Sequence, residues 1–207
     1  MKTLSNYLLV FVFSIQIIHS QDSELLFDSL ISDTNAEINL LPERIFFSQK
    51  VLWGKKGLFR LTGISKPSAE GRQKEIKLRR FMLKSHQVIG YATFAGMIAQ
   101  GVIGGRLYNG EYSLYNTHKN LGNAVTASYF TGAALSLFAP PPLVNKKVKG
   151  LNSIKAHKIL ASLHFPAMVT TKVLSDKDAD AHKIAAYTAV ISYATAIIVF
   201  KFWWKNS

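Results

Sequence analysis

The sequence predicts an all-α fold, an integral-membrane four-helix bundle with a short N-terminal extension. Four apolar stretches in the 207-residue chain each approach the ~20 residues that cross a bilayer as a helix. Mean hydropathy is +0.13 and 48% of the residues are hydrophobic, which is high for a soluble domain. The four stretches also lack the polar stripe that the helices of a soluble bundle turn toward water.

Residues 1–20 have the layout of a secretory signal peptide. Lys2 gives a basic start, an apolar run follows from Leu8 to Ile18, and Ser20 is a small residue at a suitable cleavage point. The alternative is an uncleaved first transmembrane helix. His19 lies in this segment and is therefore not counted among the candidate ligands.

Residues 21–83 are predicted to form a polar and basic extramembrane segment. Its first part, 21–43, is acidic, whereas 44–83 is basic and carries aromatic residues typical of a membrane surface. Residues 50–84 hold eleven of the 25 basic residues and only two acids. Because this cluster directly precedes the first apolar stretch, the net charge of +13 indicates lipid head groups or membrane topology rather than nucleic acid.

Residues 84–205 form the predicted four-helix domain. The first span carries no charge, the second ends at a proline run, and the third is the weakest because Pro166 lies inside it. The fourth is followed by aromatic and basic residues typical of a membrane interface. Many small residues in the first two spans allow close helix packing, and we find no convincing internal repeat. The predicted spans are residues 87–105, 120–138, 156–174 and 184–200.

One histidine stands near the start of each apolar stretch, namely His86, His118, His157 and His182. Because successive spans run in opposite directions, His86 and His157 start from one face and His118 and His182 from the other. A histidine at a membrane span is costly unless it is paired, ligated or hydrated. Two imidazoles from facing helices at one depth are what a bis-histidine haem needs. The pattern predicts two haems, one for each pair.

The chain contains no cysteine, which excludes iron–sulfur clusters and covalently attached haem. The expected cofactor is therefore haem b, bound non-covalently through its iron. A zinc or iron site without porphyrin is disfavoured, because the two pairs are expected about 25–30 Å apart by helix rise. Such a site also needs three or four converging ligands, and no acidic residue falls inside a span.

Two further residues are candidates for cofactor binding. His164 follows His157 by two helical turns on roughly the same face. It is a second-rank candidate that would hydrogen-bond within the bundle, line the space between haems or replace His157. Arg106 ends the first span on the His118 side, where a guanidinium suits a haem propionate. The alternative for Arg106 is an ordinary interfacial arginine.

These segments resemble the cytochrome b561 superfamily, which are di-haem transmembrane electron carriers, over residues 84–202. The stretches that carry the resemblance are HQVIGYATFAGMIAQGVIGGRLYNGEYSLYNTH and AHKILASLHFPAMVTTKVLSDKDADAH. The resemblance implies that His86 pairs with His157 and His118 with His182. It also implies electron transfer across a membrane, often from ascorbate or a similar reductant to ferric iron or another acceptor. The short gap between His157 and His182 departs from the family pattern.

We therefore expect a b-type cytochrome that carries electrons across a membrane, with a donor and an acceptor that the sequence does not identify. It would act as a ferric- or quinone-linked transmembrane oxidoreductase. The alternatives are a haem-free membrane scaffold or assembly subunit, and a haem-anchor subunit of a larger oxidoreductase. Expected partners are membrane lipid and a second copy or a partner oxidoreductase, with no nucleic acid. The expected location is multi-pass in the inner or plasma membrane of a bacterium.

The orientation of the domain stays open at this point. Basic residues near the spans are more numerous on the His86 side, and this bias puts the His86 side in the cytoplasm. A cleaved signal peptide would instead export residues 21–83 and place His86 on the outer side.

Overall fold

The computed structural model describes residues 41–143 and 150–202, and within them the chain is all-helical, as predicted. The predicted signal peptide, residues 21–40, 144–149 and 203–207 lie outside the described residues. Two short helices come first and four long helices follow, with one 3-10 turn before α6. They are α3 (Phe47–Trp53), α4 (Leu58–Leu61), α5 (Ala69–Tyr108), η1 (Tyr112–Leu114), α6 (Tyr115–Leu137), α7 (Ser153–Leu174) and α8 (Ala179–Phe202).

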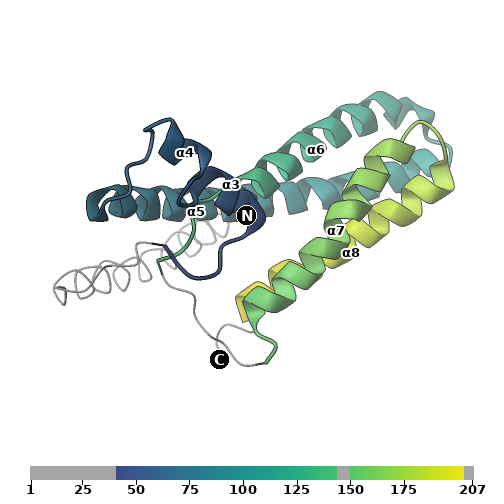
Figure 1. Ribbon diagram of the computed structural model, residues 1–207. Coiled ribbons are helices and arrows are strands. Elements are labelled where there is room, and N and C mark those ends of the chain that lie inside the picture. The colour runs from purple at the N-terminus through teal and green to yellow at the C-terminus, as the bar shows by residue number, and fades with distance from the viewer. Residues whose placement is uncertain (1–40, 144–149, 203–207) are drawn as a thin grey trace, which may run out of the picture.

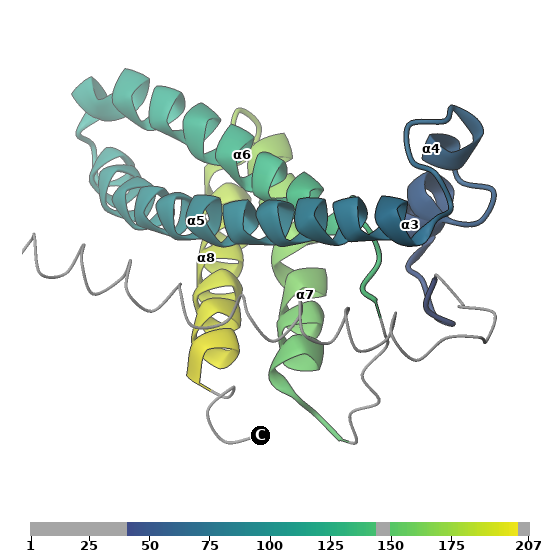
Figure 2. The ribbon, with the colours of Figure 1, turned by 90° about the vertical axis from the view of Figure 1, so that its left-hand side faces the viewer.

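The four long helices form two antiparallel hairpins, α5 with α6 and α7 with α8 (Figure 1). The hairpins cross one another, and α5 also packs on α8 (Figure 2). A small hydrophobic core lies where they cross, and all four helices contribute to it. Its buried members are Met97, Val125, Tyr129, Met168 and Ala189.

Polar side chains begin three of these helices. The side chains of Ser68, Asn152 and Asp178 each accept a hydrogen bond from the main-chain N–H three residues on, at 2.8–3.0 Å. Such caps satisfy donors that have no partner within the helix. At its other end α5 stops before Gly110, whose φ of +103° is open to glycine at little cost. These local signals fix where each hairpin begins and turns.

Each predicted span lies within or closely overlaps one long helix, and Pro166 does not interrupt α7. Two of the described helices, α5 and α8, are long and apolar enough to cross a membrane. Crossing of a membrane by all four helices is part of the proposal made below.

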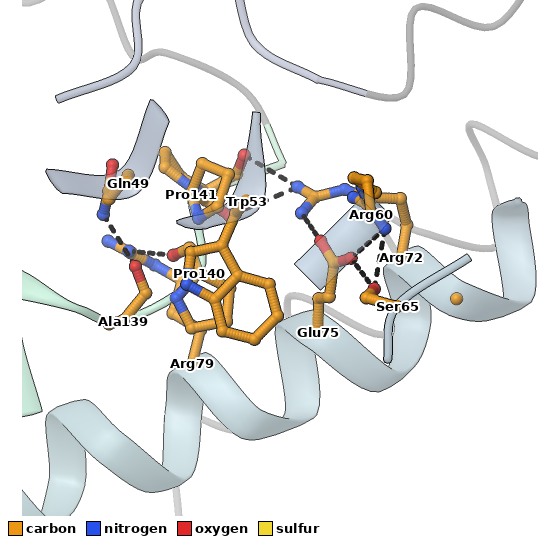
Figure 3. Close-up of polar contacts among 12 residues, drawn as sticks. Gln49, Trp53, Arg60, Ser65, Arg72, Glu75, Arg79, Ala139, Pro140 and Pro141 are labelled. Atoms are coloured by element: carbon orange, nitrogen blue, oxygen red, sulfur yellow. Dashed lines mark hydrogen bonds and ion pairs between the residues drawn. The ribbon is translucent and has the colours of Figure 1, made fainter. Parts of the chain in front are cut away.

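An N-terminal cap, made by α3, α4 and the first turns of α5, packs on the end of α6 (Figure 3). Gln49 and Trp53 donate to the carbonyls of Ala139 and Phe138 at 3.0 and 2.9 Å. These bonds satisfy carbonyls that a helix terminus leaves without partners. The cap therefore holds the proline run after α6 against the start of α5.

A buried ion cluster joins the parts of this cap. Arg72 is fully buried, and its Nη1 lies 2.5 Å from Oε2 of Glu75, which also pairs with Arg60. Arg72 and Arg79 then donate to carbonyls of the proline run. Burial lowers the pKa of Arg79, and the nearby positive charge of Arg72 lowers it further. The carboxylate of Glu75 thus holds Arg60 and Arg72 in place.

Candidate functional site

The four predicted histidines form two pairs, one at each end of the crossed hairpins. The ring centroids of His86 on α5 and His157 on α7 are 6.3 Å apart. Those of His118 on α6 and His182 on α8 are 6.2 Å apart. Each pair takes one ring from each hairpin, and its two rings meet across the interface with planes nearly perpendicular, at 82° and 81°.

This spacing fits one metal atom between the two rings of each pair. A metal–imidazole bond is about 2 Å long, and each ring nitrogen lies about 1 Å from its ring centre, so axial imidazoles on one metal have centres about 6 Å apart. Among the described residues, no group of three or more His, Cys, Asp or Glu side chains gathers as a metal site. A pair of imidazoles would hold a metal only together with a further ligand, and a porphyrin is one group that would complete such a site.

Main-chain carbonyls lie against Nδ1 of three of the four rings and so favour one tautomer of each. Nδ1 of His86 lies 2.8 Å from the carbonyl oxygen of Gly132. Nδ1 of His182 lies 2.8 Å from that of Thr171, and Nδ1 of His157 lies 3.4 Å from a carbonyl on α8. A carbonyl only accepts, so Nδ1 carries the hydrogen and the lone pair is left on Nε2. Ligand histidines are usually oriented in this way.

The fourth ring, His118, is placed by close packing on α5. A Cβ at Gly104 would lie 2.7 Å from Cε1 of the His118 ring, which is too close for any side chain at that position. The Nδ1 atom of His118 is buried and has no hydrogen-bond partner. Because Gly104 has no side chain, the ring of the candidate ligand His118 can pack directly on α5.

His164 lies between the two pairs and forms a contact of its own. It is 8% exposed, and its Nδ1 lies 2.6 Å from the hydroxyl of Tyr129. Its ring also contacts Tyr193, with centroids 5.0 Å apart. The structure therefore places His164 in a tyrosine-lined layer at the crossing, and brings His157, rather than His164, opposite His86.

Arg106 lies at the exposed end of α5, where its guanidinium binds both carboxylate oxygens of Glu111, at 2.9 and 2.6 Å. These hydrogen bonds raise the pKa of Arg106 and lower the pKa of Glu111. Nearby, Tyr108 donates to Asp180 at 2.6 Å and ties the two hairpins together. A propionate at Arg106 would compete with Glu111, and that role of Arg106 stays a prediction.

The contacts reveal an internal correspondence that the sequence reading missed. The α6 and α8 segments both begin with His-Lys and both continue with Ser-Tyr-x-Thr at the same distance, at Ser128–Thr131 and Ser192–Thr195. The α5 and α7 segments share a histidine, then phenylalanine and methionine at the same distances, Phe94 with Phe165 and Met97 with Met168. The shared letters are few and widely spaced, so composition and hydropathy conceal them.

The equivalent residues also make equivalent contacts. Gly132, which accepts from His86, corresponds to Ala196, which accepts from His157. Met97 and Met168 are both buried in the core at the crossing, and Tyr129 and Tyr193 pack on each other there. The two hairpins therefore approximate two copies of one unit, and each histidine pair joins equivalent or near-equivalent places of the two copies.

Comparison with known proteins adds no family to this description. No family model, curated protein or solved structure matches the chain.

Proposed function

We propose that this chain is an integral-membrane b-type cytochrome that carries electrons across the bilayer through two bis-histidine haems. The observation that carries the proposal is the pair of facing rings at each end of the hairpins, 6.3 and 6.2 Å apart. Haem iron held by two imidazoles takes up and releases one electron without binding a substrate. Two such sites at opposite ends of crossing helices suit transfer from one face of a membrane to the other.

The outward faces of the helices support the membrane part of the proposal. Large hydrophobic side chains project outward at helical spacing along α5, α7 and α8, where a soluble bundle would present polar groups. Such a continuous apolar surface is suited to lipid. On α5 and α8 these residues include Val88, Tyr91, Ile98, Val102, Ile184, Tyr187, Ile191 and Ile198.

The residues of the chain have separate roles in this proposal. The four histidines hold the iron, and main-chain carbonyls fix the ring orientation of three of them. The tyrosine layer around His164 separates the two sites and excludes water between them. Lys50, Lys55 and Lys56 are exposed in the cap at the His86 end, where their positive charges favour anionic lipid head groups or an anionic partner.

Histidine substitutions test the pairing directly. The full-length chain is produced with a supply of haem, and haem per chain is measured in detergent for His86→Ala, His157→Ala and the double variant. Each single variant should lose one haem of two, and the double variant should lose no more, because both histidines hold the same iron. His118→Ala with His182→Ala should behave likewise for the other haem. Loss of both haems in the His86/His157 double variant would contradict separate sites.

Proteoliposomes test whether the protein carries electrons across a membrane. Purified protein is reconstituted into vesicles that contain ferricyanide, and ascorbate is added outside. We expect reduction of the enclosed ferricyanide with the wild-type chain and none beyond the lipid blank with His86→Ala. Bound haem without transmembrane reduction would instead support the haem-anchor subunit, and a chain that binds no haem would support the scaffold.

A further inference from the structure

The His118 ring is the exception among the four candidate ligands. The other three direct Nδ1 at a main-chain carbonyl, whereas Nδ1 of His118 is buried without a partner. The carbonyl that the hairpin correspondence would supply belongs to Gln100, because Gln100 on α5 corresponds to Thr171 on α7, which serves His182. The Nδ1–carbonyl contact that the other three histidines make is therefore missing at His118.

A second buried atom without a partner belongs to Gln100, whose side chain contacts His118. Gln100 donates from Nε2 to the carbonyl oxygen of His118 at 2.9 Å, while its own Oε1 is buried and accepts nothing. Gln100 and Gly104 are one helical turn apart on α5, and the His118 ring packs on Gly104. Two buried polar atoms without partners, Oε1 of Gln100 and Nδ1 of His118, thus belong to two residues in contact.

We infer that Gln100 is the positioning residue of His118, with its side-chain Oε1 accepting the hydrogen bond from Nδ1–H of the ring. The inference rests on the proposed haem function. Iron bound at Nε2 leaves the hydrogen on Nδ1, so the ring then needs an acceptor. The inference requires the Gln100 amide to turn its Oε1 toward that hydrogen, and leaving both buried groups unpaired would cost free energy on each side.

On this inference, the midpoint potential of the His118/His182 haem depends on a side chain that can be substituted. The other three histidines depend on main-chain carbonyls, which substitution does not remove. A stronger acceptor at Gln100 makes the His118 imidazole a better electron donor and stabilises the oxidised iron, so the midpoint potential of that haem falls. Removal of the acceptor has the opposite effect. The His86/His157 haem lies at the other end of the hairpins and serves as the control within the same molecule.

The test is a spectroelectrochemical titration of the purified holoprotein in detergent, with haem per chain measured beside it. Gln100→Glu should lower one midpoint potential and Gln100→Leu should raise the same one, while the other potential stays in place. His182→Ala, which removes the haem of that end, should abolish the shifted component. Gln100→Met also removes the acceptor but keeps the length of the side chain, so it should raise the same potential and covers the case in which the leucine variant does not assemble.

The outcomes separate the inference from the proposed function. Two bound haems whose potentials are both unchanged, or both shifted equally, would overturn the role of Gln100 and leave the cytochrome intact. Absence of haem from the wild-type chain would overturn the proposed function itself.

Discussion

The α5–α6 hairpin and the α7–α8 hairpin present the same residues to each other but differ around them. Both carry two candidate ligand histidines, a buried methionine and a tyrosine at the crossing. Thr93 stands in the first hairpin where His164 stands in the second, and only α5 extends into the cap. The repeated histidines, methionines and tyrosines meet where the two hairpins contact each other. The interface therefore positions the candidate ligands, and the differences give each end its own properties.

The largest expected effect concerns the contact between Gly104 and His118. Gly104→Ala places a methyl group 2.7 Å from the His118 ring, and the ring must leave its position. We expect loss of one haem of two, measured as haem per chain after purification. Gly105→Ala is the matched control, because a Cβ there meets nothing within 4 Å. Equal haem loss in both variants would show that helix integrity, not the ring contact, is responsible.

The N-terminal cap belongs to the first hairpin and has no counterpart on the second, so the next prediction concerns its buried ion pair. Glu75→Gln leaves the buried guanidinium of Arg72 without its counter-charge, and breaking a buried pair in this way costs about 3–5 kcal/mol. The free energy of unfolding, measured by denaturant titration in detergent, should fall by about that amount. Glu70→Gln is the control, because its pair with Lys74 is exposed. An unchanged stability for Glu75→Gln would mean that the cap does not support the fold.

His164→Thr makes the second hairpin resemble the first at the crossing. The hydroxyl of Tyr129 then loses its 2.6 Å partner, and a buried group left unpaired costs about 1–3 kcal/mol. We expect a lower thermal midpoint and two haems per chain. Loss of a haem in this variant, together with full haem content in His157→Ala, would reverse the assignment and make His164 the ligand.

The smallest expected effect is the acid sensitivity of the Arg106–Glu111 pair. Hydrogen bonding to Arg106 lowers the pKa of Glu111 below its ordinary 4.5, so the pair stabilises the fold at neutral pH. That contribution is lost only as the pH falls through the lowered pKa, and exposure and salt keep it small. The difference in thermal midpoint between wild type and Glu111→Gln should therefore vanish in strong acid. A difference that grows on acidification would contradict the ion pair.

The helices were predictable because long apolar runs, capping residues and Gly110 leave local marks in the sequence. The alternation of span directions was enough to predict which histidines face each other, and it depends only on the number of spans. The structure brings together the two rings of each of these pairs. The pairing follows from a simple topological constraint, which needs no knowledge of side-chain packing.

Other parts of the site depend on contacts between distant segments. How the helices are shifted along one another decides which side chains meet, and the sequence pattern does not determine this shift. It sets the packing of the His118 ring on Gly104, the unpartnered Nδ1 of His118 and the Tyr129–His164 hydrogen bond. The cap likewise depends on Gln49, Trp53 and Arg72 meeting carbonyls some seventy to ninety positions along the chain. The similarity between the two hairpins could have been found from the sequence alone by aligning them on their histidines, because both then share Ser-Tyr-x-Thr and Phe-x-x-Met.

The central claim is that the two histidine pairs each hold one haem. The most direct measurement is the reduced-minus-oxidised absorption spectrum of the purified full-length chain, with haem counted per polypeptide. We predict the sharp α-band of six-coordinate b-type haem and about two haems per chain, with one left in His86→Ala and one in His182→Ala. A colourless chain that takes up no haem on reconstitution would contradict the account.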